Sequence, residues 1–175
     1  MRRVRAALLD LSGWTGVGFG AGPDLIRSVD LRADRARIGG SEFADVGFKI
    51  EDKPDAISFV FSGPTVEGTV QVPTGDIVKR GITAQLSRLH WPESPKTPPG
   101  AADTDPLDGV VPSTIPPLHI AIDDFRLGTA VFGETRLESV PAAGGMRIDQ
   151  FDTRSPALQI RARGEWTGDG RAQST

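Results

Sequence analysis

The sequence predicts an all-β fold with little helix, and three observations lead to this expectation. Apolar and polar residues alternate with a period of two in several short runs. Glycine (21) and proline (14) make up one fifth of the 175 residues, which favours many short elements. Turn sequences such as Gly39-Gly40 and Gly144-Gly145 separate the runs.

The alternating runs define the expected strands in chain order. Ile57, Phe59 and Phe61 alternate with small or polar residues, and Val70 and Val72 flank a glutamine. The same period-two pattern continues through residues 82–87, 118–123 and 158–166. Each run has one apolar side and one polar side, which is typical of a sheet with a single buried face.

Composition excludes several classes of protein. Hydrophobic residues (38%) and charged residues (25%) fall in the range of globular chains rather than disordered ones. A net charge of -3 with interspersed signs argues against a nucleic-acid partner. The absence of cysteine excludes a disulfide framework and thiolate metal sites. No run approaches the roughly 18 to 20 apolar residues of a transmembrane helix.

Proline divides the chain into two β-rich blocks. Residues 92–117 contain eight of the fourteen prolines and predict an extended or mobile linker. This linker separates a first β-meander unit (24–91) from a second one (118–175), which we expect to be truncated at its C-terminal end. Residues 1–23 are expected to connect units, and residues 2–11 within them fit a short helix.

The two blocks resemble one another. When residues 29–50 are written above residues 118–139, Asp34 falls over Asp123, Arg37 over Arg126 and Phe43 over Phe132, at a constant offset of 89 residues. In each block two further alternating runs follow, at 57–61 and 66–72 in the first and at 146–151 and 158–166 in the second. We interpret this as a degenerate repeat of a β-meander unit.

These segments together resemble a known family. The order of residues 29–50, 56–63, 66–73 and 82–92, followed by the Pro116–Gly128 segment PPLHIAIDDFRLG and the Leu158–Trp166 segment LQIRARGEW, is similar to a unit of the YhdP-type proteins of the AsmA-like superfamily. The resemblance covers the chain from about residue 13 onward and depends on the order of the segments rather than on any single motif.

The resemblance implies a fold and a role. Proteins of this family are very long envelope proteins, held in the inner membrane by one N-terminal helix, with a β-rich body in the periplasm. An open, twisted, groove-shaped antiparallel sheet of repeated units would pass phospholipid between the inner and outer membranes and so serve outer-membrane biogenesis. This chain would be an internal fragment without the anchor helix, with further repeats of the parent chain as its partners.

A groove that holds acyl chains requires no polar site, because each buried CH2 contributes roughly 0.8 kcal/mol. We therefore expect neither catalysis nor a cofactor. Alternation nominates the residues that would line the groove: Ile57, Phe59, Phe61, Leu118, Ile120, Ile122, Leu158 and Ile160.

Other candidate residues fit simpler roles. His90 and His119 match no metal-ligand spacing, and His119 is expected to be a solvated residue. Asp123 and Asp124 are adjacent, so they should point to opposite faces unless a bulge brings them together. Asp103, Asp105 and Asp108 lack the rest of a calcium loop, and the glycines of residues 16–22 lack a nucleotide-binding context. Trp14, Trp91 and Trp166 fit either a lipid rim or core packing.

Two alternatives from other classes stay open. Without the resemblance, the pattern favours a β-sandwich in which two apolar faces cover each other, serving as a scaffold or binding module of the envelope. A glycan-binding module would need an aromatic platform, yet the chain has no tyrosine. A hydrolase would need a pair of carboxylates on one face, and no such pair is evident.

Overall fold

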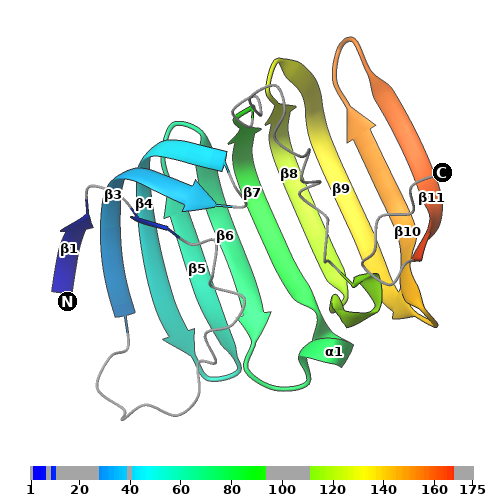
Figure 1. Ribbon diagram of the computed structural model, residues 1–175, viewed down its shortest axis with the longest axis horizontal. Coiled ribbons are helices and arrows are strands. Elements are labelled where there is room, and N and C mark those ends of the chain that lie inside the picture. Colours follow the sequence, from blue (N-terminus) through cyan, green and yellow to red (C-terminus); the bar gives the residue numbers. More distant parts are fainter. Residues whose placement is uncertain (1, 7–8, 11–27, 39–40, 94–110, 168–175) are drawn as a thin grey trace, which may run out of the picture.

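All described strands belong to one open sheet. The computed structural model describes residues 2–6, 9–10, 28–38, 41–93 and 111–167. The sheet has eleven strands in the order β1-β3-β4-β5-β6-β7-β8-β9-β10-β11, and β2 also pairs with β3 (Figure 1). The prediction of an open all-β sheet with little helix is confirmed.

The strands cover most of the described chain. Their bounds are β1 Arg2–Ala6, β2 Leu9–Asp10, β3 Ser28–Ile38, β4 Ser41–Lys53, β5 Ala56–Ser62, β6 Val66–Pro73, β7 Ile82–Trp91, β8 Leu118–Leu127, β9 Ala130–Ala142, β10 Gly145–Arg154 and β11 Gln159–Thr167. Two short helices accompany them, α1 (Ile77–Arg80) and the 3-10 helix η2 (Pro112–Thr114).

Most neighbouring strands are antiparallel, but three pairs are parallel. β7 pairs with β8 in parallel, and β1 and β2 both pair with β3 in parallel. A parallel pair needs a connection that returns along the whole strand, and the proline-rich segment after β7 is long enough to do this. The sheet therefore passes from the first meander to the second without interruption.

Two expectations about the connecting segments need correction. Residues 2–6 and 9–10 form strands rather than a short helix, because pairing with β3 supplies their backbone hydrogen bonds. The end of the linker is ordered: η2 lies against β9, β10 and β11, and Pro112 is fully buried. Residues 94–110 lie outside the described part of the chain.

Two pairs of strand starts lie at the offset of 89 residues seen in the sequence. β4 begins at Ser41 and β9 at Ala130, while β5 begins at Ala56 and β10 at Gly145. Both separations are 89 residues (130 minus 41 and 145 minus 56), whereas β3 and β8 begin 90 residues apart and β6 and β11 begin 93 residues apart; the repeat stays an interpretation.

Bulges keep the apolar side chains on one face. Between Leu86 and Leu89, β7 has one residue more than β6, and between Ile122 and Phe125, β8 has one residue more than β9. Each extra residue shifts the alternation by one position. Leu89 therefore stays on the same face as Leu86.

The main buried cluster forms where the β3–β4 hairpin bends. Asp45 has a φ of 50°, in the left-handed region, and the far ends of β3 and β4 curve toward β7 (Figure 1). This bend brings Phe43 against Trp91, with ring centroids 5.3 Å apart and edge to face. The Trp91 indole donates a hydrogen bond of 2.8 Å to the Ser41 hydroxyl. The cluster also contains Ala33, Ala36, Val46 and Val66.

Candidate functional site

The candidate functional site is the apolar face of the sheet. The strand registers place one residue from each of nine neighbouring strands in a single line, which we name the apolar row. With about 4.8 Å between strands, this row extends over roughly 38 Å. Its members are Val29, Ile50, Phe59, Val70, Ala84, Ile120, Leu137, Phe151 and Ala162.

A second line of residues runs beside the apolar row on the same face. Leu31, Phe48 and Phe61 lie at its β3–β5 end, while Thr135 and Thr153 interrupt its apolar character on β9 and β10. The Phe48 ring centroid is 5.7 Å from that of Phe59 and 5.2 Å from that of Phe61. These three rings form a continuous aromatic patch over β4 and β5.

The apolar row is only partly covered. Ala84 is buried and Ala162 is exposed, while the other seven members are half-buried. The interior of a sandwich would bury such residues fully, and all described strands belong to one sheet. The second sheet that the sandwich alternative requires is therefore not found among the described residues.

Seven of the eight residues nominated from the sequence lie on this apolar face. Their registers place Ile57, Phe59 and Phe61 on β5, Leu118, Ile120 and Ile122 on β8, and Ile160 on β11. Contact of these residues with lipid stays a prediction. Leu158 lies outside β11, in the turn that follows β10, where its backbone oxygen accepts a hydrogen bond from Ser155. Leu158 belongs to the turn rather than to the strand because its backbone N–H and C=O groups pair with Ser155 and close the β10–β11 hairpin.

Several residues of the same face were not nominated from the sequence. Phe48 and Leu137 belong to it, as do Val70 and Phe151. Alternation through residues 46, 48 and 50 was a signal that could have identified Phe48. Phe151 was harder to find, because β10 has a register shift between Ile148 and Phe151.

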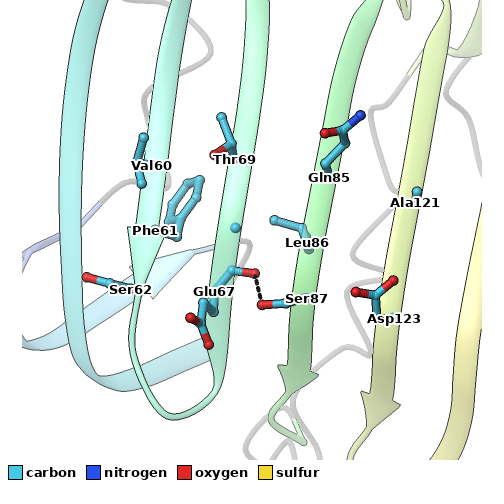
Figure 2. A pocket seen from close by; sticks show the side chains of 11 residues that line it. Val60, Phe61, Ser62, Glu67, Thr69, Gln85, Leu86, Ser87, Ala121 and Asp123 are labelled. Carbon is cyan, nitrogen blue, oxygen red and sulfur yellow. Dashed lines mark hydrogen bonds between the residues drawn. The ribbon is translucent and has the colours of Figure 1, made fainter.

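The opposite face is polar and carries a shallow open depression of about 630 Å3 over β5 to β8 (Figure 2). Glu67, Gln85, Ser87 and Asp123 contribute polar side chains to it. Gly68 is also among the lining residues. Its φ is 138°, and a Cβ atom there would be 2.4 Å from the Gln85 carbonyl oxygen.

Both histidines of the chain pair with carboxylates. His90 Nε2 lies 2.6 Å from Asp124 Oδ2, and the Arg126 guanidinium donates to the same carboxylate at 3.1 and 3.2 Å. His119 pairs with Glu138 across β8 and β9, so it is not simply solvated. The bulge in β8 gives Asp124 these partners while Asp123 lines the depression, and the two carboxylates therefore have separate surroundings.

Comparison with known proteins identifies the family. A family described as "YhdP protein" matches residues 3–175, nearly the whole chain. The chain belongs to the YhdP family. No curated protein and no solved structure matches it. Membership associates this YhdP-family chain with the cell envelope and with proteins of the AsmA-like kind.

The described residues of this YhdP-family chain contain neither a membrane-spanning helix nor a cluster of metal ligands. None of their helices is long and apolar enough to cross a membrane. Within the same residues, no group of three or more His, Cys, Asp or Glu is placed to hold a metal ion. Trp14, the glycines of residues 16–22 and the acidic residues Asp103, Asp105 and Asp108 lie outside the described ranges.

Acid should weaken the YhdP-family fold partly through Asp124. Its hydrogen bond with His90, and then that with Arg126, hold the pKa of the Asp124 carboxyl below its usual 3.8. A lowered folded-state pKa contributes stability above the unfolded pKa, and this contribution is lost as the pH falls through the folded value. The loss is therefore expected below about pH 4.

Urea denaturation at a series of pH values from about 5 to about 2 checks this expectation. The Asp124→Asn variant should lose less stability over this range than the wild-type chain. Asp123→Asn, which changes an adjacent exposed carboxylate outside the pair, serves as the matched control and should follow the wild-type curve. Equal acid sensitivity of the wild-type chain and Asp124→Asn would show that this pair does not contribute.

Proposed function

We propose that the apolar face holds the acyl chains of phospholipids and forms part of a path for their movement between the inner and outer membranes, through the periplasm, without catalysis. The observation that carries this proposal is the apolar row: nine apolar residues from nine strands, most of them only half-buried. Membership of the YhdP family supports it.

The dimensions of the row suit this role. The hydrocarbon core of a bilayer is about 30 Å thick, so one acyl chain reaches about 15 Å. The row extends over roughly 38 Å and is therefore longer than one extended acyl chain. An apolar strip of this length offers successive equivalent positions, so a chain could shift along it without losing contact area.

The chemistry of the face also suits a carrier rather than a receptor. Affinity for an acyl chain arises only from the apolar surface that binding removes from water, at roughly 0.8 kcal/mol for each buried CH2. Charged pairs such as His119 with Glu138 lie on the other face. A lipid headgroup therefore meets no fixed partner over the row, which favours movement over tight binding.

The first experiment is mass spectrometry of lipids extracted from the purified full chain, beside an unrelated β-protein that is expressed and purified in the same way. Enrichment of phospholipid in the YhdP-family sample supports the proposal. A well-folded sample without enrichment contradicts it and favours the scaffold alternative.

A matched pair of variants tests the face itself. Ile120→Glu puts a charge in the middle of the apolar row, whereas Ala121→Glu puts the same charge on the neighbouring residue of the polar face. We expect retained phospholipid to fall at least about tenfold in Ile120→Glu, since about 1.4 kcal/mol of lost binding suffices. Ala121→Glu should retain the wild-type amount. Equal retention in both variants would exclude this face as the lipid site.

A further inference from the structure

The tip of the β3–β4 hairpin covers one end of the apolar face. Phe43 lies on β4, yet its ring contacts Trp91 on β7, which is three strands further along the sheet. Phe61 and Leu89 of the apolar face pack against the same buried cluster. The hairpin therefore crosses over β5 and β6 on this face, as its curved ribbons show (Figure 1). We name this part of the hairpin the roof; it comprises residues 35–38 and 41–44.

The other end of the face, in the first meander, is formed by two exposed connections. One is the β4–β5 turn, and the other leads from β6 through α1 to β7. We name residues 52–55 and 73–80 the open rim. Ten of these twelve residues are exposed, whereas Phe43 in the roof is 1% exposed. The apolar face over β4 to β7 thus has one covered end and one accessible end.

The distance between these ends fits one acyl chain. Ile57, Phe59 and Phe61 lead along β5 from the open rim to the roof. From Ala56 to Phe61 the strand extends by roughly 17 Å, while an acyl chain reaches about 15 Å. A chain lying along β5 would place its methyl end at the roof, because buried apolar side chains there offer a charged headgroup no partner. This step depends on the lipid role proposed above.

The open rim carries charges of both signs. The Arg80 guanidinium donates a hydrogen bond of 3.0 Å to the Asp55 carboxylate, and Lys79 Nζ lies 3.6 Å from Asp76 Oδ2. All four side chains are at least 47% exposed, so a ligand can reach both members of each pair. The charged residues of the rim are Asp52, Asp55, Asp76, Lys53, Lys79 and Arg80, which gives a net charge of zero.

We propose that the headgroup of a bound phospholipid lies at the open rim and that this rim selects zwitterionic over anionic phospholipids. The phosphate of a zwitterionic headgroup can pair with Arg80 or Lys79, and its ammonium can pair with Asp55 or Asp76. An anionic headgroup has no cation to offer these carboxylates, which repel it. The net charge of -3 on the whole chain also disfavours anionic lipids.

A competition experiment tests the selection. The purified full chain is exchanged in detergent with an equimolar mixture of phosphatidylethanolamine and phosphatidylglycerol that carry identical acyl chains, and bound lipid is measured by mass spectrometry. The bound ratio of phosphatidylethanolamine to phosphatidylglycerol should exceed the input ratio at least about threefold. The double variant Asp52→Asn/Asp55→Asn should lower this bound ratio at least about threefold. Glu67→Gln/Asp123→Asn changes the net charge equally on the polar face and should keep the wild-type ratio.

Fluorescence quenching tests the orientation of the chain. Replacing Trp14 and Trp166 with phenylalanine leaves Trp91, beside the roof, as the single tryptophan. A phospholipid brominated near the methyl ends of its chains should quench Trp91 at least about twofold more than one brominated near its ester groups, since the methyl end lies at the roof.

Two outcomes would overturn the selection and leave the proposed function standing: bound lipid at the input ratio in the wild-type chain, or an equal change of ratio in both double variants. Equal quenching by the two brominated lipids would overturn the orientation in the same way. Absence of lipid from every well-folded sample would instead contradict the proposed function, and this inference with it.

Discussion

Replacing Phe43 with alanine is expected to lower the free energy of unfolding by about 3 to 5 kcal/mol, which is the cost of removing a fully packed phenyl ring. Phe43 is 1% exposed and packs edge to face on Trp91. The ring joins the bent tip of the β3–β4 hairpin to the end of β7, so its loss leaves a cavity where two distant parts of the sheet meet. Small domains have only about 5 to 15 kcal/mol of net stability.

Urea denaturation followed by circular dichroism measures this effect. Val78→Ala is the matched control, because Val78 is 68% exposed on α1 and its truncation should change the stability by no more than about 0.5 kcal/mol. A loss of less than about 1 kcal/mol for Phe43→Ala would show that the hairpin tip is not packed on β7 in solution.

A second large loss of stability is expected for Gly68→Ala. Its φ of 138° lies in a region that L-residues rarely adopt, and a Cβ atom there would be 2.5 Å from the Leu86 Cα atom. Backbone strain of about 1 to 3 kcal/mol and a comparable cost for the steric clash should together destabilise the fold by about 3 kcal/mol or more. The bulge beside Gly68 would have to rearrange to relieve the clash.

Gly75→Ala provides the comparison for this prediction. A Cβ atom at Gly75 meets nothing within 4 Å, and the residue lies in an exposed turn. Its stability should change by no more than about 0.5 kcal/mol, or increase slightly because the unfolded chain becomes less flexible. Equal midpoints for the two glycine variants in thermal or urea denaturation would refute the role assigned to Gly68.

Local alternation predicted the strands well because it depends on neighbouring residues only. The run through Phe59 and the run through Ile120 both became strands with the expected apolar side. The offset of 89 residues also anticipated where β9 and β10 begin. The apolar face could therefore be assembled from the sequence in outline, one strand at a time.

Features that depend on distant partners could not be predicted in this way. The contact between Phe43 and Trp91 joins residues 48 positions apart and depends on the bend at Asp45. The bulges in β7 and β8 become visible only against their neighbours. The bulge in β8 puts Asp123 and Asp124 on the same polar face, whereas a regular strand would point them to opposite faces. Residues 2–6 form β1 instead of the expected helix because they pair with β3, which begins only at Ser28 and is not a neighbour in the sequence.

The parallel pairing of β7 with β8 has a consequence for how such a sheet can change in evolution. The strands β3 to β7 alternate in direction, so β7 runs the same way as β3. Because β8 is parallel to β7, it also runs this way and can start the next meander as β3 started the first. Duplicating or deleting the DNA that encodes one such five-strand unit would change the width of the sheet by roughly 24 Å, at about 4.8 Å for each strand. Every remaining strand would keep its original direction. In a protein built in this way the number of units sets the width of the sheet, with no redesign of any one of them.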